Sequence, residues 1–216
     1  MTRRHDKRLN VRQEKQRKPV ALLAVEGWNV TESKYFQSFQ NRNVSYTIKI
    51  LRTKSLTDPK GMLSELQKHW NAMELSKEQG DVAFLVTDLD CDNDKAIILR
   101  DLIQKNPDIN FIISNPCFEI WFLLHFVYST KSYIDGKALI NELKKHIPEY
   151  EKNIDVSALI SDKTGVAINN AEKLEKHFES MGMNWPEKDC NPRTDVNKML
   201  NSIIVMKKHN RREGKI

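Results

Sequence analysis

Carboxylates directly follow the two most apolar short segments of the chain. Glu26 comes after Val20–Val25, and Asp88 and Asp90 follow Val82–Val86. Uninterrupted apolar runs of this length are typical of strands buried on both faces of a parallel sheet, and such sheets bind ligands at the carboxyl ends of their strands. If the two strands are neighbours, the three carboxylates meet at one edge and repel one another. A hard divalent cation, Mg²⁺ or Mn²⁺, would relieve that repulsion.

The sequence therefore predicts a metal site formed by Glu26, Asp88 and Asp90. Residues two apart in an extended chain point to the same side, so Asp88 and Asp90 are expected to bind one ion, directly or through its water. Gly27 allows a ligand to approach the backbone next to Glu26. Taken alone, an acid at a strand end is usually solvated, and a pair of aspartates often caps a helix. The two features together, on two buried strands, favour the metal site.

The elements that must position these acids alternate along residues 19–128. Apolar runs and alternating patterns predict strands near 20–25, 46–51, 82–86 and 109–113, the second of them at an edge of the sheet. Helices are expected from Thr31, from Pro59 with Asp58 as N-cap, after a cap at Asp92 or Asn93, and from Asn115-Pro116. This order predicts a mostly parallel α/β sheet of about four strands.

Beyond Ser129 the sequence predicts helices but no strand. Apolar residues at helical spacing cover 137–147, 166–178 and 193–207. We therefore divide the chain into a basic N-terminal arm over residues 1–18, an α/β core over 19–128 and a helical C-terminal extension over 129–216.

The composition fits one compact domain with a heavily charged surface. Of the 216 residues, 39% are hydrophobic and 30% charged, which argues against a disordered chain and against a disulfide-rich secreted one. Three cysteines at wide spacings favour the reducing cytoplasm and argue against a structural zinc site. The most apolar stretch, residues 111–128, is interrupted by polar and charged side chains, which favours a soluble protein with no membrane partner.

Basic residues are concentrated at the two ends of the chain. Residues 1–18 contain eight Lys and Arg against two acids, and residues 207–216 contain five against one. Since the ends carry +6 and +4 and the whole chain +6, the part between them carries −4. The basic ends are expected to contact a polyanion such as nucleic acid, unless they only keep the protein in solution. The candidate contacts in the arm are Arg3, Arg4, Lys7 and Arg8.

Several motifs together resemble a known family. A strand that ends in Val25-Glu26-Gly27, a later strand that ends in Asp88-Leu89-Asp90 and an edge strand between them resemble the TOPRIM fold of topoisomerases, primases and overcoming-lysogenisation-defect nucleases. The closer resemblance is to the RloB family, TOPRIM proteins found with restriction and abortive-infection loci. It spans about residues 20–204 and is carried by Val25-Glu26-Gly27-x-x-x-Thr31-Glu32-x-x-Tyr35-Phe36, Asp88-x-Asp90, Ser114-Asn115-Pro116-Cys117-Phe118-Glu119-Ile120-Trp121, Leu124-His125-Phe126 and Asn191-Pro192-Arg193-Thr194-x-Val196. The string from Asn115 to Trp121 is the most specific, and Arg193 stands where a serine is commoner in the family.

The resemblance implies a TOPRIM-like Rossmannoid fold and a metal-dependent endonuclease that uses Mg²⁺ or Mn²⁺ as an anti-phage defence effector. It implies RNA, with tRNA foremost, ahead of DNA as the substrate, and a separate ABC-type ATPase as the partner. Carried over by motif, Glu26 is a general base or metal ligand, Asp88 and Asp90 are metal ligands, and Glu119 is a further acidic catalytic residue. Whether the protein forms homo-oligomers stays open.

Other interpretations of some residues stay open as well. Glu119, in the first turn of an expected helix, would also pair favourably with the helix dipole. His125, six residues later, is expected to be a hydrogen-bonded core histidine. Tyr150 and Lys152 follow Pro148 in an expected loop, where they would either contact nucleic acid or form a solvated turn.

Two other functions compete with the nuclease. A haloacid-dehalogenase-type phosphatase also has Asp-x-Asp after a strand, but there the pair usually follows the first strand of the core, and Glu26 would have no role. A non-catalytic nucleic-acid-binding or antitoxin-like subunit would retain the acids without using them. The sequence has no Gly-x-x-x-x-Gly-Lys-Ser/Thr loop, so any control by a nucleotide is expected to come from another protein.

Overall fold

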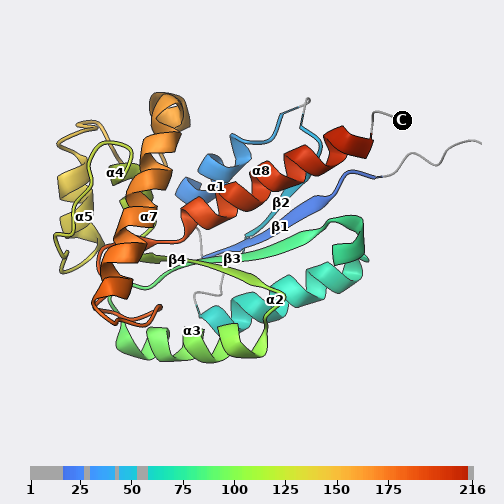
Figure 1. Ribbon diagram of the computed structural model, residues 1–216, viewed down its shortest axis with the longest axis horizontal. Helices are drawn as coiled ribbons and strands as arrows, with labels where there is room; N and C mark the ends of the chain where they lie inside the picture. The colour runs from blue at the N-terminus through green and yellow to red at the C-terminus, as the bar shows by residue number, and fades with distance from the viewer. Residues whose placement is uncertain (1–16, 27–29, 42–43, 53–57, 214–216) are drawn as a thin grey trace, which may run out of the picture.

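The computed structural model describes residues 17–213 apart from 27–29, 42–43 and 53–57. Its centre is a sheet of five strands in the order β2-β1-β3-β4-β5 (Figure 1). Strands β1 to β4 are parallel to their neighbours, and β5 is antiparallel to β4. The predicted α/β sheet and the edge position of β2 are therefore confirmed. The strands are β1 (Val20–Val25), β2 (Thr47–Arg52), β3 (Val82–Asp88), β4 (Asn110–Asn115) and β5 (Arg193–Thr194).

Helices cover both faces of the sheet. In Figure 1, α1 (Val30–Gln37) and α8 (Val196–Glu213) lie on one face, and α2 (Pro59–Ala72) and α3 (Asn93–Lys105) lie on the other. The helices α4 (Glu119–Leu123), α5 (Gly136–Leu143) and α7 (Thr164–Ser180) gather at one end of the sheet. Short turns of helix at Lys77–Gln79, Ser157–Ile160 (α6) and Ser161–Lys163 complete the set. Over the described ranges, no helix is both long and apolar enough to span a membrane.

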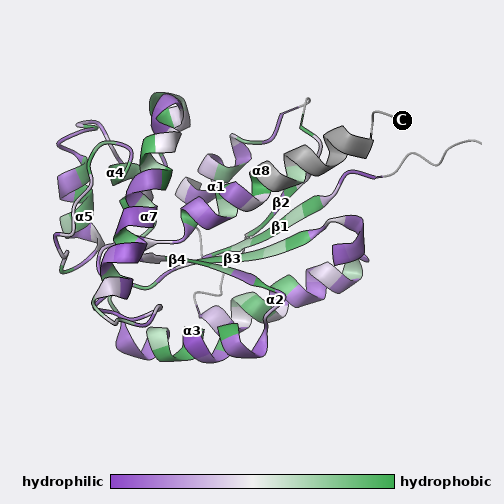
Figure 2. Ribbon diagram, in the orientation of Figure 1, coloured by the Kyte–Doolittle hydropathy of each residue, from purple (hydrophilic) through white to green (hydrophobic). Residues whose placement is uncertain are grey.

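Strands β1 and β3 are buried on both faces, as their uninterrupted apolar sequences predict. Alternate side chains of β1 pack on opposite faces of the sheet. The side chains that pack toward α1 and α8 are Ala21, Leu23 and Val25. Those that pack toward α2 are Val20, Leu22 and Ala24. Figure 2 shows the hydrophobic colouring of these central strands. Because helices cover both faces, polar side chains at the strand ends gather at the edges of the sheet, and the carboxyl edge is where ligands bind in such folds.

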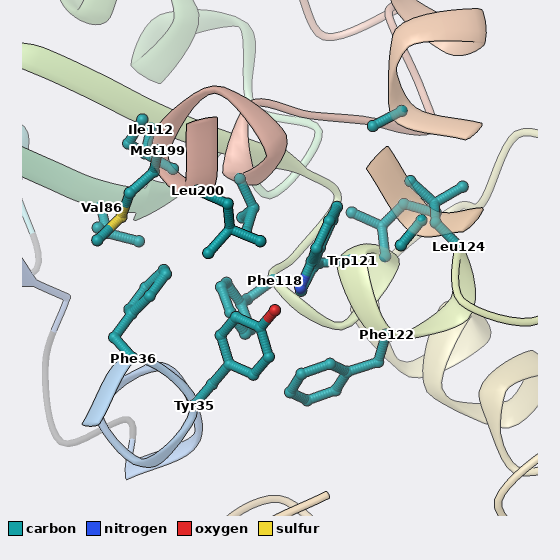
Figure 3. Packing of buried hydrophobic residues seen from close by; sticks show 14 of the residues in the cluster. Tyr35, Phe36, Val86, Ile112, Phe118, Trp121, Phe122, Leu124, Met199 and Leu200 are labelled. Atoms are coloured by element: carbon teal, nitrogen blue, oxygen red, sulfur yellow. The ribbon is translucent and has the colours of Figure 1, made fainter. Parts of the chain in front are cut away.

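The helices after Ser129 share one hydrophobic core with α1 and β1. Tyr35 of α1 lies edge-to-face with Phe118 and Phe122, at ring-centroid distances of 5.8 and 5.6 Å, and Leu200 of α8 belongs to the same cluster (Figure 3). Edge-to-face pairs of this kind contribute about 0.5–1.5 kcal/mol each beyond their buried area. The aromatic residues of the specific 115–121 string therefore serve packing.

The sequence predicts no strand after Ser129, and this prediction is wrong. Strand β5 pairs with the end of β4, and the hydroxyls of Ser114 and Thr194 hydrogen-bond at 2.8 Å. A two-residue strand is too short to produce an alternating pattern in the sequence. The sheet consequently has five strands rather than four, and the helix expected from residue 193 begins at Val196.

The helix expected from residues 115–116 begins at Glu119 instead. Asn115 is the last residue of β4, and its side chain joins two loops. Its Oδ1 accepts the N–H of Cys91 at 3.1 Å, and its Nδ2 donates to the carbonyls of Lys188 and Cys190 at 2.8 and 3.0 Å. An amide engaged in this way is unavailable as a helix cap. The predicted caps of α2 and α3 are confirmed at Asp58 and Asp92.

A buried carboxylate joins the amino ends of β1 and β3. The side chain of Asp81 is fully buried, accepts the N–H groups of Val20 at 2.8 Å and Ser76 at 2.9 Å, and pairs with Arg17. Burial raises the pKa of Asp81, but Arg17 and the two N–H donors outweigh burial and hold this pKa below its ordinary value. The interaction stabilises the sheet at the amino ends of β1 and β3, opposite the carboxyl ends that Glu26 and Asp88 occupy.

Replacing Asp81 with alanine tests this interaction. Asp81→Ala leaves the N–H groups of Val20, which is buried, and Ser76, which is half-buried, without this acceptor, so we expect the free energy of unfolding at pH 7 to fall by about 2–4 kcal/mol. Because the pKa of Asp81 is lowered on folding, wild type has this stability above about pH 4 and loses it as the pH falls further. Urea denaturation at pH 7 and at pH 3 measures both effects. A loss at pH 7 no larger than that of Arg17→Gln, whose side chain is 41% exposed, would contradict the interpretation.

Candidate active site at the carboxyl edge of the sheet

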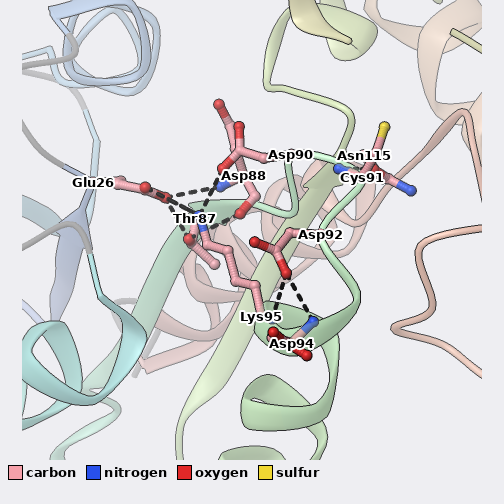
Figure 4. A network of polar contacts seen from close by, with 9 residues as sticks. All are labelled: Glu26, Thr87, Asp88, Asp90, Cys91, Asp92, Asp94, Lys95 and Asn115. Carbon is pink, nitrogen blue, oxygen red and sulfur yellow. Dashed lines mark hydrogen bonds and ion pairs between the residues drawn. The ribbon is translucent and has the colours of Figure 1, made fainter. Parts of the chain in front are cut away.

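The ends of β1 and β3 bring Glu26 and Asp88 together. The two strands are neighbours, with Val25 opposite Val86, so Glu26 lies beside the last residues of β3. Glu26 Oε2 accepts the hydroxyl of Thr87 and the main-chain N–H of Asp88, the latter at 3.2 Å (Figure 4). The adjacency on which the predicted site depends is therefore confirmed, and the carboxylate of Glu26 is held in a fixed orientation.

Lys95 joins Glu26 to Asp90. Its Nζ lies 3.1 Å from both carboxylate oxygens of Glu26 and 2.9 Å from Asp90 Oδ2 (Figure 4). Lys95 stands in the first turn of α3, and only 13% of its side chain is exposed. Burial lowers the pKa of Lys95, but the two carboxylates outweigh burial and keep this pKa above its ordinary value. Lys95 is thus a charged internal partner for two of the three predicted metal ligands.

Asp90 does not continue the extended strand, so the expected alignment of Asp88 and Asp90 is wrong. β3 ends at Asp88, and Asp90 has the left-handed φ of 57°. Its N–H donates to the carbonyl of Pro116 at 2.9 Å, which fixes this turn to the loop after β4. Asp88, the last residue of β3, is buried, whereas the side chain of Asp90 in the turn is 58% exposed.

Asp88 is the most deeply buried of the three predicted ligands, with 8% of the residue exposed. Over the described residues, its hydrogen bonds engage the main chain and leave its carboxylate without a donor. Burial raises the pKa of Asp88 well above its ordinary value, and the carboxylates of Glu32 and Glu119 raise it further, followed by those of Asp90 and Glu26. Asp88 is therefore the centre of a cluster of acids.

Glu32 and Glu119 also belong to this cluster of acids around Asp88. Both are buried, Glu32 in α1 and Glu119 as the first residue of α4. Burial raises the pKa of Glu32 to about 7, with a further contribution from Glu119. The hydroxyl of Tyr150 donates to Glu119 Oε1 at 3.0 Å. Tyr150 is fully buried, so the expectation that it lies in a solvated turn or contacts nucleic acid is wrong.

Lys152 is a second cation at this cluster. It lies in an exposed segment after Tyr150, where Asn153 accepts a hydrogen bond from Lys34 and donates its N–H to Thr31 Oγ1 at 3.2 Å. Burial lowers the pKa of Lys152, but Glu119, Cys117 and the other acids outweigh it and keep this pKa above its ordinary value. The C-terminal extension thus places a positive charge beside acids of the core.

The remaining candidate residues divide between the core and the arm. His125 is buried, its Nδ1 lies 2.9 Å from the carbonyl oxygen of Trp121, and burial lowers its pKa to about 4. The expected hydrogen-bonded core histidine is therefore confirmed. The candidate nucleic-acid contacts of the arm lie outside the described residues, and they are Arg3, Arg4, Lys7 and Arg8.

The donors of the acidic edge suit a hard divalent cation. Its side chains are carboxylates, and within the described ranges the carboxylate of Asp88 accepts no hydrogen bond that would stabilise its ionised form. Within residues 17–213, leaving out the three gaps, no three His, Cys, Asp or Glu side chains form a group that could hold an ion as they stand. The contacts explain this, because Glu26 and Asp90 are already held by Lys95. Asp88 and Glu26 are the residues that would bind an ion first.

Three residues of the site are not evident from patterns in the sequence. Glu32 follows the helix start expected at Thr31 and is indistinguishable in the sequence from a solvated acid, although it belongs to the motif at residues 25–36. Thr87 continues the apolar run of β3, so the sequence does not distinguish it from the other residues of that buried strand. Lys95 offers one usable signal, since it comes three residues after the cap Asp92 and therefore stands in the turn of α3 nearest the strand ends.

The shifted pKa of Glu32 predicts a pH-dependent stability of the metal-free protein. A glutamate in an unfolded chain titrates near pH 4.3, so folding stability is lost as the pH rises from about 4.3 through about 7. Glu32→Gln removes this loss, and we expect its free energy of unfolding at pH 8 to exceed that of wild type by about 1–3 kcal/mol. Near pH 4.5 the two proteins should be equally stable.

Urea denaturation in EDTA between pH 4.5 and pH 8 measures the difference. Glu149→Gln, at an exposed position, is the matched control and should follow wild type throughout. A difference between Glu32→Gln and wild type that is the same at every pH would rule out titration of Glu32 as the cause.

No curated protein matches the chain. A family model described as RloB-like protein matches residues 21–203, a range that includes Glu26, Glu32, Asp88 and Glu119. Because the match extends over more than half of the sequence, the chain belongs to the RloB-like family.

Proposed function

We propose that this protein is a metal-dependent endonuclease that hydrolyses phosphodiesters of nucleic acid, RNA in preference to DNA. The observation that carries the proposal is the burial of Asp88 among the carboxylates of Glu26, Glu32 and Glu119 at the carboxyl edge of the sheet. Buried charges of one sign are unfavourable unless a proton or a cation neutralises them. An enzyme that binds a cation and a phosphate at this edge has a use for that arrangement, whereas a purely structural edge has none.

The contacts of Asp88 and Glu26 suit ligand binding. A bound Mg²⁺ or Mn²⁺ supplies Lewis-acid activation of the scissile phosphate and lowers the pKa of a bound water. Asp88 and Glu26 would hold the ion, because Asp88 is buried among acids and the carboxylate of Glu26 is oriented by Thr87 and the N–H of Asp88. Asp90, whose side chain lies in an exposed turn, would be the third ligand of the ion.

Proton transfer suits Glu32 better than Glu26. Both carboxylate oxygens of Glu26 contact the ammonium of Lys95, so they are already engaged in the metal-free protein. Glu32 is buried beside Asp88, and its pKa of about 7 lies where a general base is most effective near neutral pH. We therefore assign ligand binding to Glu26 and proton transfer to Glu32. Glu119, held by Tyr150, is a further acid of the site.

The distribution of basic residues supports a polyanionic substrate. Lys152 is exposed beside the acids, and the ends of the chain are strongly basic. Lys and Arg bind phosphates of nucleic acid whatever the sequence, by releasing counterions. The preference for tRNA, the role in anti-phage defence and the separate ABC-type ATPase rest on the resemblance to nucleases of restriction-linked loci. The lack of a P-loop motif in the sequence fits control by such a partner.

Neutralising single acids tests the proposed site. We expect Mn²⁺ to raise the melting temperature of wild type, since an ion that binds only the folded state at one hundred times its Kd stabilises it by about 2.7 kcal/mol. Asp88→Asn should lose this gain together with cleavage of total tRNA, while remaining at least as stable as wild type in EDTA. Glu26→Gln should lose the same two properties and also some stability in EDTA, because it gives up the pair with Lys95.

The matched control is Asp101→Asn, at an exposed position of α3 far from the strand ends, which should retain both the Mn²⁺ effect and cleavage. An equal Mn²⁺ effect in all four proteins would contradict the site. Hydrolysis of a small phosphoester without cleavage of tRNA, rRNA or plasmid would favour the phosphatase. Metal-independent binding of nucleic acid without cleavage would favour the non-catalytic subunit.

A further inference from the structure

The ammonium of Lys95 occupies the space between two of the three predicted metal ligands. It lies within 3.1 Å of both oxygens of Glu26 and within 2.9 Å of Asp90. An ammonium in this position compensates the two carboxylates much as a divalent cation would. Because an ammonium and a dication at the same oxygens repel each other, a metal ion that binds Glu26 there competes with Lys95.

The main chain of Lys95 is fixed, so any exchange must be a movement of its side chain. Asp92 caps α3 and accepts the N–H groups of Asp94 at 2.7 Å and Lys95 at 3.0 Å. On the next turns Ala96 and Leu99 are fully buried in the same small cluster as Leu89 and Ile113. This packing prevents the helix from turning, whereas the four methylene groups of the lysine leave its ammonium free to swing.

We propose, on the basis of the function proposed above, that Lys95 is the exchangeable counter-ion of this site. In the metal-free protein it holds Glu26 and Asp90, and a divalent cation that binds Asp88 and Glu26 displaces it. Lys95 is a positioning residue, since it acts on metal binding through Glu26, which it holds in place until the ion arrives.

Chemical labelling of wild type tests the exchange directly. The intact protein is reductively methylated with formaldehyde and borohydride, with EDTA or with excess Mn²⁺, and the extent of modification of each lysine is read by peptide mass spectrometry. We expect the labelling rate of Lys95 to rise at least about threefold when Mn²⁺ binds, because its ammonium loses both carboxylate partners and becomes exposed. Lys105, paired with Asp101 at the other end of α3, is the internal control and should not change.

A variant gives a second, independent readout. Lys95→Gln should melt at a lower temperature than wild type in EDTA. It should nevertheless bind Mn²⁺ more tightly, with an apparent Kd at least about fivefold lower than that of wild type, because a factor of five is the lower end of ordinary coupling between two ligands. A merely structural role of Lys95 would lower the melting temperature by the same amount with and without Mn²⁺ and would not tighten binding. Lys105→Gln is the matched variant and should bind Mn²⁺ as wild type does.

The outcomes separate the two proposals. If wild type binds Mn²⁺ but the labelling of Lys95 stays constant and Lys95→Gln binds no more tightly, the exchange is refuted and the metal-dependent function stands. If neither wild type nor Lys95→Gln binds Mn²⁺ or Mg²⁺, both proposals fail together. Faster labelling of Lys95 with tighter binding by the variant supports the exchange.

Discussion

Burial of ionisable carboxylates at the carboxyl edge of the sheet constrains the rest of this structure. Burial raises the pKa of Asp88 well above its ordinary value, and Glu32 and Glu119 add to that shift. Each such group lowers the stability of the folded state when it ionises, so the molecule must gain stability elsewhere. The compensating stability comes from neighbouring parts of the core. β1 is buried along its whole length, and Tyr35 of α1 packs edge-to-face against Phe118 and Phe122 at α4.

Two lysines divide the acidic cluster between them. Lys95 of α3 forms ion pairs with Glu26 and Asp90. Lys152, in the C-terminal extension, interacts electrostatically with Glu119. Asp88 lies between these two groups, with neither lysine in contact with its carboxylate among the described residues. Within the described part of the chain, no ammonium therefore offsets the charge that Asp88 acquires when it ionises. Asp88 is the position at which an added cation would relieve the most repulsion.

The sequence predicts the parts of this arrangement that depend on local pattern. Apolar runs identify β1 and β3 because strands buried on both faces need no polar side chains, and the acids after them follow from where such strands end. The turn at Asp90 could not be predicted in this way, since its left-handed φ is held by a hydrogen bond to Pro116, a residue from another strand end. Glu32 and Lys95 look like solvated helix residues in the sequence, and only their tertiary neighbours distinguish them. Strand β5 is too short to produce any pattern.

The C-terminal extension belongs to the site as much as to the scaffold. The hydroxyl of Tyr150 is the hydrogen-bond donor to Glu119, and the segment that carries Lys152 is attached to α1 through Thr31. β5 and α8 cover the sheet at its β4 end and complete the core that supports α1. Residues 19–128 alone would contain every predicted acid, but they would leave Glu119 without this donor and the acidic cluster without its second cation. The electrostatic balance at Asp88 is therefore a property of nearly the whole matched range, which agrees with a family model that extends from residue 21 to residue 203.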